Sequence, residues 1–172
     1  RTFVLYWVPG GRQTADADGA TFSVANYDDG WISAYYNNVS GALNSANSAV
    51  DVATQQIAAG TNKTYTSNLL QVARIWRAYL MSEMSDCFGP IPTNAFQGKN
   101  PEFSSVKDDY YYMLSELKDA SAKMDISITS NPPNVSKEDP VFGFDYTKWQ
   151  RYANSLRLRL AMRLSEVDQN KA

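Results

Sequence analysis

The stretch from Trp149 to Glu166, WQRYANSLRLRLAMRLSE, decides the fold because it fits two different secondary structures. Its leucines alternate with arginines, and a period of two is typical of a half-buried strand. Its apolar residues also recur every three or four positions, which is typical of one helix face. No β-branched residue, Gly or Pro interrupts the segment, and Leu, Arg, Ala and Met are strong helix formers. We therefore predict a helix whose buried face holds Trp149, Ala153, Leu156, Leu160 and Leu164.

Three earlier segments also carry apolar residues at helical spacing. We expect helices at about 29–59, 67–88 and 105–124, with the final helix beginning near Asp145. Gly60 and Gly89 are stop signals after the first two, and Ser105 begins a sequence that resembles a capping box. The first helix is expected to be irregular near Gly41. The sequence thus predicts an all-α stack of helical hairpins with long irregular loops.

Two regions differ in character. Residues 1–28 begin with an apolar, aromatic run and continue as a polar loop, so we expect an extended N-terminal arm that docks on another surface. Residues 29–172 form the predicted helical scaffold. Because no stop signal follows the final helix, we expect this scaffold to be the first part of a longer domain. The start at Arg1, without Met, predicts a processed or truncated beginning.

Composition excludes several classes of function. The 172 residues are 44% hydrophobic with a net charge of −2, as in soluble globular proteins, and nothing indicates a nucleic-acid partner. The chain has no His, which excludes Ser/His and Cys/His catalysis and His-containing zinc sites within it. We expect no metal and no cofactor. No segment reaches the ~18 consecutive apolar residues that span a bilayer.

Charged residues and the single cysteine lead to three structural expectations. The C-terminal 28 residues carry six Lys/Arg and three Asp/Glu, and we expect the arginines to reach acidic neighbours. The carboxylate pairs Glu83/Asp86 and Glu116/Asp119 lie three residues apart on single helices rather than across a cleft, so they are interpreted as solvated helix faces and not as a glycosidase pair. Cys87 ends an apolar stripe and is expected to be a buried thiol.

One cluster of residues, in the N-terminal arm, has the composition of a carbohydrate-binding site. Carbohydrate binding needs flat aromatic faces together with planar polar groups that pair with adjacent hydroxyls. The N-terminal arm places such residues close together in the sequence, although the two aromatic ones could equally anchor the arm to the helices. The candidate carbohydrate-binding residues are Tyr6, Trp7, Arg12, Asp16 and Asp18.

Three blocks of the sequence match motifs that occur together in one protein family. The first block, residues 85–96, reads SDCFGPIPTNAF and is similar to a helix end followed by a turn of the F/Y-G-x-I/V-P type. The second, residues 97–120, reads QGKNPEFSSVKDDYYYMLSELKDA. The third, residues 145–165, reads DYTKWQRYANSLRLRLAMRLS and is the most specific, because it resembles D-x-x-K-W-x-x-[FY]-A-N-S-L-[RK]-L-R-[LM]-A-x-R.

In order and spacing, the three blocks resemble the SusD/RagB family of outer-membrane glycan-binding lipoproteins. This resemblance implies a tetratricopeptide-like helical scaffold without catalytic activity. Such a protein captures oligosaccharide at the cell surface and delivers it to a SusC-like TonB-dependent outer-membrane transporter. Family members are lipoproteins anchored near the mature N-terminus, and Cys87 lies mid-chain, so we expect membrane contact only through a lipid anchor absent from this chain. Family members are also longer, so much of the binding surface is expected beyond residue 172.

The sequence leaves two alternatives to an oligosaccharide-binding subunit. One is a helical-repeat module whose ligand is a protein, and the other is a glycoside hydrolase. A peptide cargo in place of a glycan also stays open. Trp149 is expected to lie in the core rather than to contact a ligand.

Overall fold

The structure is a computed structural model that describes residues 29–93, 102–128, 131 and 133–170. The described residues form five helices and no strand, which confirms the predicted all-α, tetratricopeptide-like fold. The four long helices lie within a few residues of their predicted bounds. A short fifth helix interrupts the predicted loop before the last one. The elements are α1 (Asp29–Ala58), α2 (Thr66–Phe88), α3 (Val106–Lys123), α4 (Pro133–Ser136) and α5 (Tyr146–Met162).

The burial pattern of α5 confirms the helical interpretation of the decisive stretch. A period of two would bury Leu158 and Met162, but these side chains are 63% and 60% exposed. The residues at helical spacing are buried instead, and they are Trp149, Ala153, Leu156, Leu160 and Leu164. The helix is capped by Asp145, whose side chain accepts a hydrogen bond from the backbone N–H of Lys148 at 3.0 Å.

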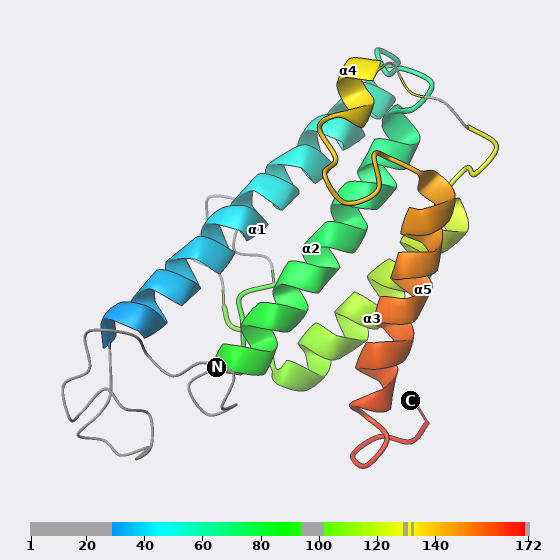
Figure 1. Ribbon diagram of the computed structural model, residues 1–172. Helices are drawn as coiled ribbons and strands as arrows, with labels where there is room; N and C mark the ends of the chain where they lie inside the picture. The colour runs from blue at the N-terminus through cyan, green and yellow to red at the C-terminus, as the bar shows by residue number, and fades with distance from the viewer. Residues whose placement is uncertain (1–28, 94–101, 129–130, 132, 171–172) are drawn as a thin grey trace, which may run out of the picture. The chain divides into compact units, whose positions relative to one another are not determined.

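Helices α2, α3 and α5 pack into one core. Helix α3 lies antiparallel to α2 and α5, and packs against both (Figure 1). The C-terminal ends of α2 and α5 therefore lie beside the N-terminal end of α3. The most deeply buried apolar side chains come from these three helices and include Ile75, Met113, Leu117, Ala120, Ala153 and Leu160.

A buried ionic network joins α2 to α3. Glu116 accepts two hydrogen bonds from Arg74, at 2.7 and 3.1 Å, and one from Arg77 at 2.7 Å. Arg77 also donates to the hydroxyl of Tyr112 at 2.7 Å and to the amide oxygen of Asn47 on α1 at 3.1 Å. The expectation that Glu116 belongs to a solvated helix face is wrong. Its side chain is only 15% exposed, because two arginines of the facing helix cover it.

The loop between α3 and α5 is held by two buried polar side chains. Asn68 donates to the backbone carbonyl of Asp125 and accepts from its N–H, both at 2.8 Å. Asp139 accepts four N–H groups, from Val141, Phe142, Phe144 and the indole of Trp149. Such complete pairing explains how an irregular loop can cover the core.

Gly41 in α1 and Gly89 at the end of α2 have different effects on the backbone. Helix α1 is continuous through Gly41, so the predicted irregularity is absent. Gly89 ends α2 with φ 82° and ψ −133°, a conformation that other residues rarely adopt. Cys87, the next-to-last residue of α2, is exposed, so the expected burial of its thiol is wrong. Its position lies on the solvent side of α2.

Alanine substitutions at these two glycines should act in opposite directions. Gly41→Ala should raise the free energy of unfolding by about 0.5–1 kcal/mol, because no heavy atom lies within 4 Å of the added carbon and alanine restricts the unfolded chain. Gly89→Ala should lower the free energy of unfolding by about 1–3 kcal/mol through backbone strain. Urea denaturation of the two variants provides the test. Equal effects at both positions would contradict the assigned backbone conformations.

Candidate functional site

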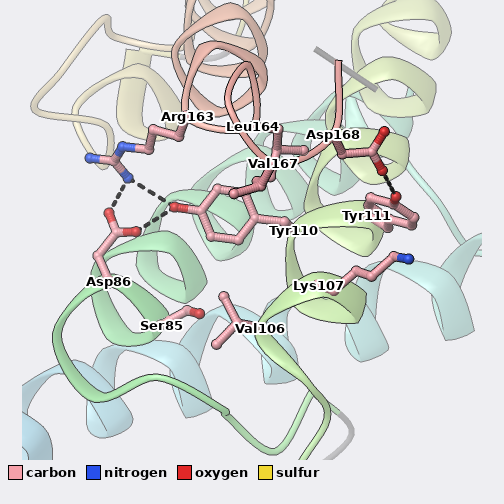
Figure 2. A pocket seen from close by; sticks show the side chains of 10 residues that line it. All are labelled: Ser85, Asp86, Val106, Lys107, Tyr110, Tyr111, Arg163, Leu164, Val167 and Asp168. Carbon is pink, nitrogen blue, oxygen red and sulfur yellow. Dashed lines mark hydrogen bonds and ion pairs between the residues drawn. The ribbon is translucent and has the colours of Figure 1, made fainter. Parts of the chain in front are cut away.

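A groove of about 480 Å³ opens where the three core helices end together (Figure 2). We call it the helix-end groove. Its walls come from the last turn of α2, the first turns of α3, and the segment that follows α5. It lies entirely within residues 39–172, which form one unit of the chain.

One wall of the helix-end groove is a hydrogen-bonded triad. The Tyr110 hydroxyl donates to Asp86 Oδ1 at 2.5 Å, and Arg163 forms an ion pair with the other carboxylate oxygen. Arg163 also donates to the Tyr110 hydroxyl at 3.3 Å. Burial and the bond to Asp86 raise the pKa of Tyr110, so the phenol stays protonated at neutral pH. Burial alone would lower the pKa of Arg163, but Tyr110 and Asp86 raise it, so the guanidinium stays charged.

The opposite wall is formed by the next residues of α3 and the chain after α5. The Tyr111 hydroxyl donates to the carboxylate of Asp168, which raises the pKa of that phenol. The ammonium of Lys107 lies 5.4 Å from the centre of the Tyr111 ring. Between the two walls lie apolar side chains, namely Val106, Leu164 and Val167.

Ser85 is the unusual member of the lining. The residue is 3% exposed, and its hydroxyl oxygen has no hydrogen-bond partner among the described residues. Figure 2 shows this hydroxyl pointing toward Val106, on the inner side of the ring of lining side chains. Burying an unpaired hydroxyl costs about 1–3 kcal/mol. A folded chain therefore carries an energetic cost at this position that alanine would avoid.

Buried hydrogen bonds fix the approach of α2 and α3 that creates the groove. Asp109, fully buried, accepts the N–H of Ile91 at 3.2 Å and the hydroxyl of Thr93 at 2.6 Å. Burial is the main reason that the pKa of Asp109 is raised. These bonds tie the turn after Gly89 to the first turn of α3. The side chains at positions 85–86 consequently face those at 106–111.

The arrangement is suited to binding a small polar ligand. Aromatic rings and aliphatic side chains offer flat apolar contact, and the charged groups around them offer hydrogen bonds of both kinds. The described residues contain no group of three or more Cys, Asp or Glu side chains that could share a metal ion. Among the described helices, none is both long enough and apolar enough to cross a membrane.

The site residues predicted from the sequence are not those of the groove. Tyr6, Trp7, Arg12, Asp16 and Asp18 lie outside the described residues, so their role in carbohydrate binding stays a prediction. The groove was missed, although a signal for it existed. Eight of its ten lining residues belong to the three blocks on which the family resemblance rests. The fold brings a part of each block to the same place: the beginning of the first, the middle of the second and the end of the third.

Comparison with known proteins identifies the chain's relatives. A sequence model of SusD-like proteins, described as SusD and RagB outer membrane lipoproteins, matches residues 10–172. The chain belongs to the SusD-like family. This membership confirms the resemblance carried by the three sequence blocks. A search of proteins with curated functional descriptions found no match.

Two solved structures are similar to this SusD-like chain. A SusD homologue from Parabacteroides distasonis is 35% identical, with a TM-score of 0.68, over 84% of this chain and 27% of that one. A Bacteroidetes protein described as AC2a SusD-like is also 35% identical, with a TM-score of 0.53, over 70% of this chain and 22% of that one. The SusD-like chain therefore spans about a quarter of the length of these relatives.

The third block of the SusD-like chain has a structural role at its tryptophan. Trp149 is 3% exposed and donates its indole N–H to Asp139 at 2.7 Å. Its ring lies 5.2 Å from that of Phe142 and 5.6 Å from that of Tyr152, both edge to face. The prediction that Trp149 lies in the core is confirmed. The last arginine of the block, Arg163, instead reaches the groove and pairs with an acidic neighbour, as expected for this helix.

Proposed function

We propose that this chain is part of a non-catalytic nutrient-binding subunit at the surface of the outer membrane. The subunit captures oligosaccharide and delivers it to a SusC-like TonB-dependent outer-membrane transporter. The observation that carries the proposal is the match to the SusD-like family across residues 10–172. A lipid anchor holds the subunit at the membrane. The ligand is held by aromatic contact and hydrogen bonds, and is released when the transporter complex opens.

The engagement of the acidic side chains supports binding without catalysis. A glycoside hydrolase needs two carboxyl groups that flank the scissile bond, one of them able to donate a proton. Glu116 is ion-paired to two arginines. Burial alone would raise the pKa of Glu116, but the two arginines lower it below its ordinary value. Asp86 is paired with Arg163. These two acids thus have structural partners and do not face each other across a cleft.

Affinity electrophoresis of the protein as its gene encodes it tests the proposal. In gels that contain single polysaccharides, we expect retarded migration with at least one glycan and normal migration with the others. Bovine serum albumin in the same gels serves as the non-binding control. Absence of retardation with every glycan would contradict oligosaccharide capture, and release of reducing ends from a retarding glycan would favour the hydrolase.

A protein ligand is the second candidate, and the outer face of α5 favours it. Leu158 and Met162 are one helical turn apart and both more than half exposed, which is a feature of protein-binding helices. Replacing both by glutamate separates the two functions. Loss of glycan retardation in this variant would favour one shared site. Unchanged retardation would leave the face available for a protein such as the transporter.

A further inference from the structure

The Ser85 hydroxyl has no hydrogen-bond partner in the described part of the chain, and this requires an explanation because such buried groups are rare in folded proteins. A serine in a helix usually donates to a backbone carbonyl three or four residues earlier, as Ser82 does to Tyr79 at 2.7 Å. Ser85 lies one turn further along the same helix and makes no such bond. Its hydroxyl instead faces the helix-end groove. A ligand in that groove would supply the missing partner.

We propose that the helix-end groove is a subsite for one neutral pyranose unit of the captured oligosaccharide. This inference rests on the proposed function and adds where one sugar unit binds and which chemical class it belongs to. The volume of about 480 Å³ lies in the range of small-molecule sites. The lining combines an apolar floor with polar groups at both walls. A pyranose ring has the matching character, because its C–H faces are apolar and its edge carries hydroxyls.

The contacts follow from the lining. The apolar face of the sugar lies on Val106, Val167 and the edge of the Tyr111 ring. Its hydroxyls can donate to the carboxylate of Asp86 and accept from the guanidinium of Arg163, which is 36% exposed and has further N–H groups. The Ser85 oxygen has less than 1 Å² of accessible surface. The contact with it therefore requires a small displacement of Val106, which is 40% exposed at the first turn of α3.

The charges select a neutral sugar. The lining holds two cations and two anions, and one of each forms the ion pair between Arg163 and Asp86. The other two, Lys107 and Asp168, stand at the opposite wall. A carboxylate or phosphate ligand would meet an anion beside each cation, so the groove gives it no net attraction. A sugar hydroxyl can donate a hydrogen bond to an anionic side chain and accept one from a cationic side chain.

Two substitutions test the subsite by calorimetric titration of the full chain with malto-, manno- and galacto-oligosaccharides and with oligogalacturonate. Ser85→Ala should weaken binding of the preferred neutral oligosaccharide about fivefold, the loss of one hydrogen bond. The same variant should be more stable than the wild type, because it removes an unpaired buried hydroxyl. Val106→Trp fills the groove from an exposed position and should weaken binding more than tenfold.

The control is Ser121→Ala. Ser121 is also a buried helical serine, but its hydroxyl donates to the carbonyl of Lys118 at 3.0 Å and lies outside the groove. Its substitution should leave binding unchanged. Wild-type binding that survives both groove substitutions would overturn the subsite and leave the proposed function intact. Preferential binding of oligogalacturonate, lost in Val106→Trp, would overturn the neutral class. Absence of wild-type binding to any glycan would overturn the proposed function, and the subsite with it.

Discussion

Replacing Glu116 by alanine is expected to lower the free energy of unfolding by about 3–5 kcal/mol, because it leaves buried guanidinium groups without their shared carboxylate. The side chains of Arg74 and Arg77 are 13% and 15% exposed, so water cannot replace the lost partner. Arg74 keeps an ion pair with Asp119 at 2.7 Å. Among the described residues, the remaining partners of Arg77 are neutral, namely the Tyr112 hydroxyl and the Asn47 amide. Most of the cost should therefore fall on Arg77.

Asp119→Ala is the matched control for Glu116→Ala. Both acids lie on α3 and both pair with Arg74, but the Asp119 side chain is 43% exposed. Because water screens an exposed ion pair, Asp119→Ala should lower the unfolding free energy much less than Glu116→Ala does. Urea denaturation of the two variants measures both values. Equal losses would show that burial does not determine the strength of this network.

A triple substitution separates the role of the charges from the role of the packing. Arg74→Met, Arg77→Leu and Glu116→Leu together remove every buried charge of the network and retain most of its volume. Replacement of a buried ionic cluster by apolar residues is often neutral or stabilising by about 1–4 kcal/mol. We expect the triple variant to be at least as stable as the wild type. A loss as large as that of Glu116→Ala would mean that the ion pairs themselves stabilise the fold.

The helices could be predicted from the sequence because their signals are local. The spacing of Leu156, Leu160 and Leu164 depends only on which face of α5 is buried. The start of α3 was predicted from Ser105, and its side chain does accept the N–H of Asp108 at 3.1 Å. The end of α2 was predicted from Gly89, which adopts the positive φ that glycine allows.

The partners of the polar side chains could not be predicted, because they depend on contacts between distant positions. Glu116 meets Arg74 and Arg77 across 42 and 39 residues of sequence. Nothing in the helical period around Glu116 distinguishes a buried acid from a solvated one. The groove could not be predicted for the same reason, because its pair Asp86 and Arg163 is separated by 77 residues of sequence. The sequence of the loop before α5 indicated only that it is rich in Pro and Gly. It gave no sign that Asp139 holds the loop by accepting hydrogen bonds.

Replacing Asp139 by asparagine is expected to lower the free energy of unfolding at pH 7 by about 3 kcal/mol, because an amide cannot accept all four N–H groups. The carboxylate accepts from Val141 and Phe144 at 2.8 Å, from Phe142 at 3.3 Å and from the indole of Trp149 at 2.7 Å. Gly143 and Phe144 adopt positive φ values of 59° and 55° to bring those N–H groups around it. Loss of the carboxylate thus also removes what holds Phe144 in an unfavourable conformation.

The effect of Asp139→Asn should shrink as the pH falls. Burial alone would raise the pKa of Asp139, but the N–H groups of Phe144, Trp149 and their neighbours lower it below its ordinary value of 3.8. A depressed folded-state pKa stabilises the protein above the unfolded-state pKa, and this stabilisation disappears as the pH falls through the folded-state value. Below about pH 4 the wild type therefore loses the stabilisation by the ionised carboxylate, which the variant lacks at every pH. Urea denaturation at pH 7 and pH 3 should show a smaller difference between the two proteins at pH 3, and a constant difference would mean that the carboxylate charge does not hold the loop.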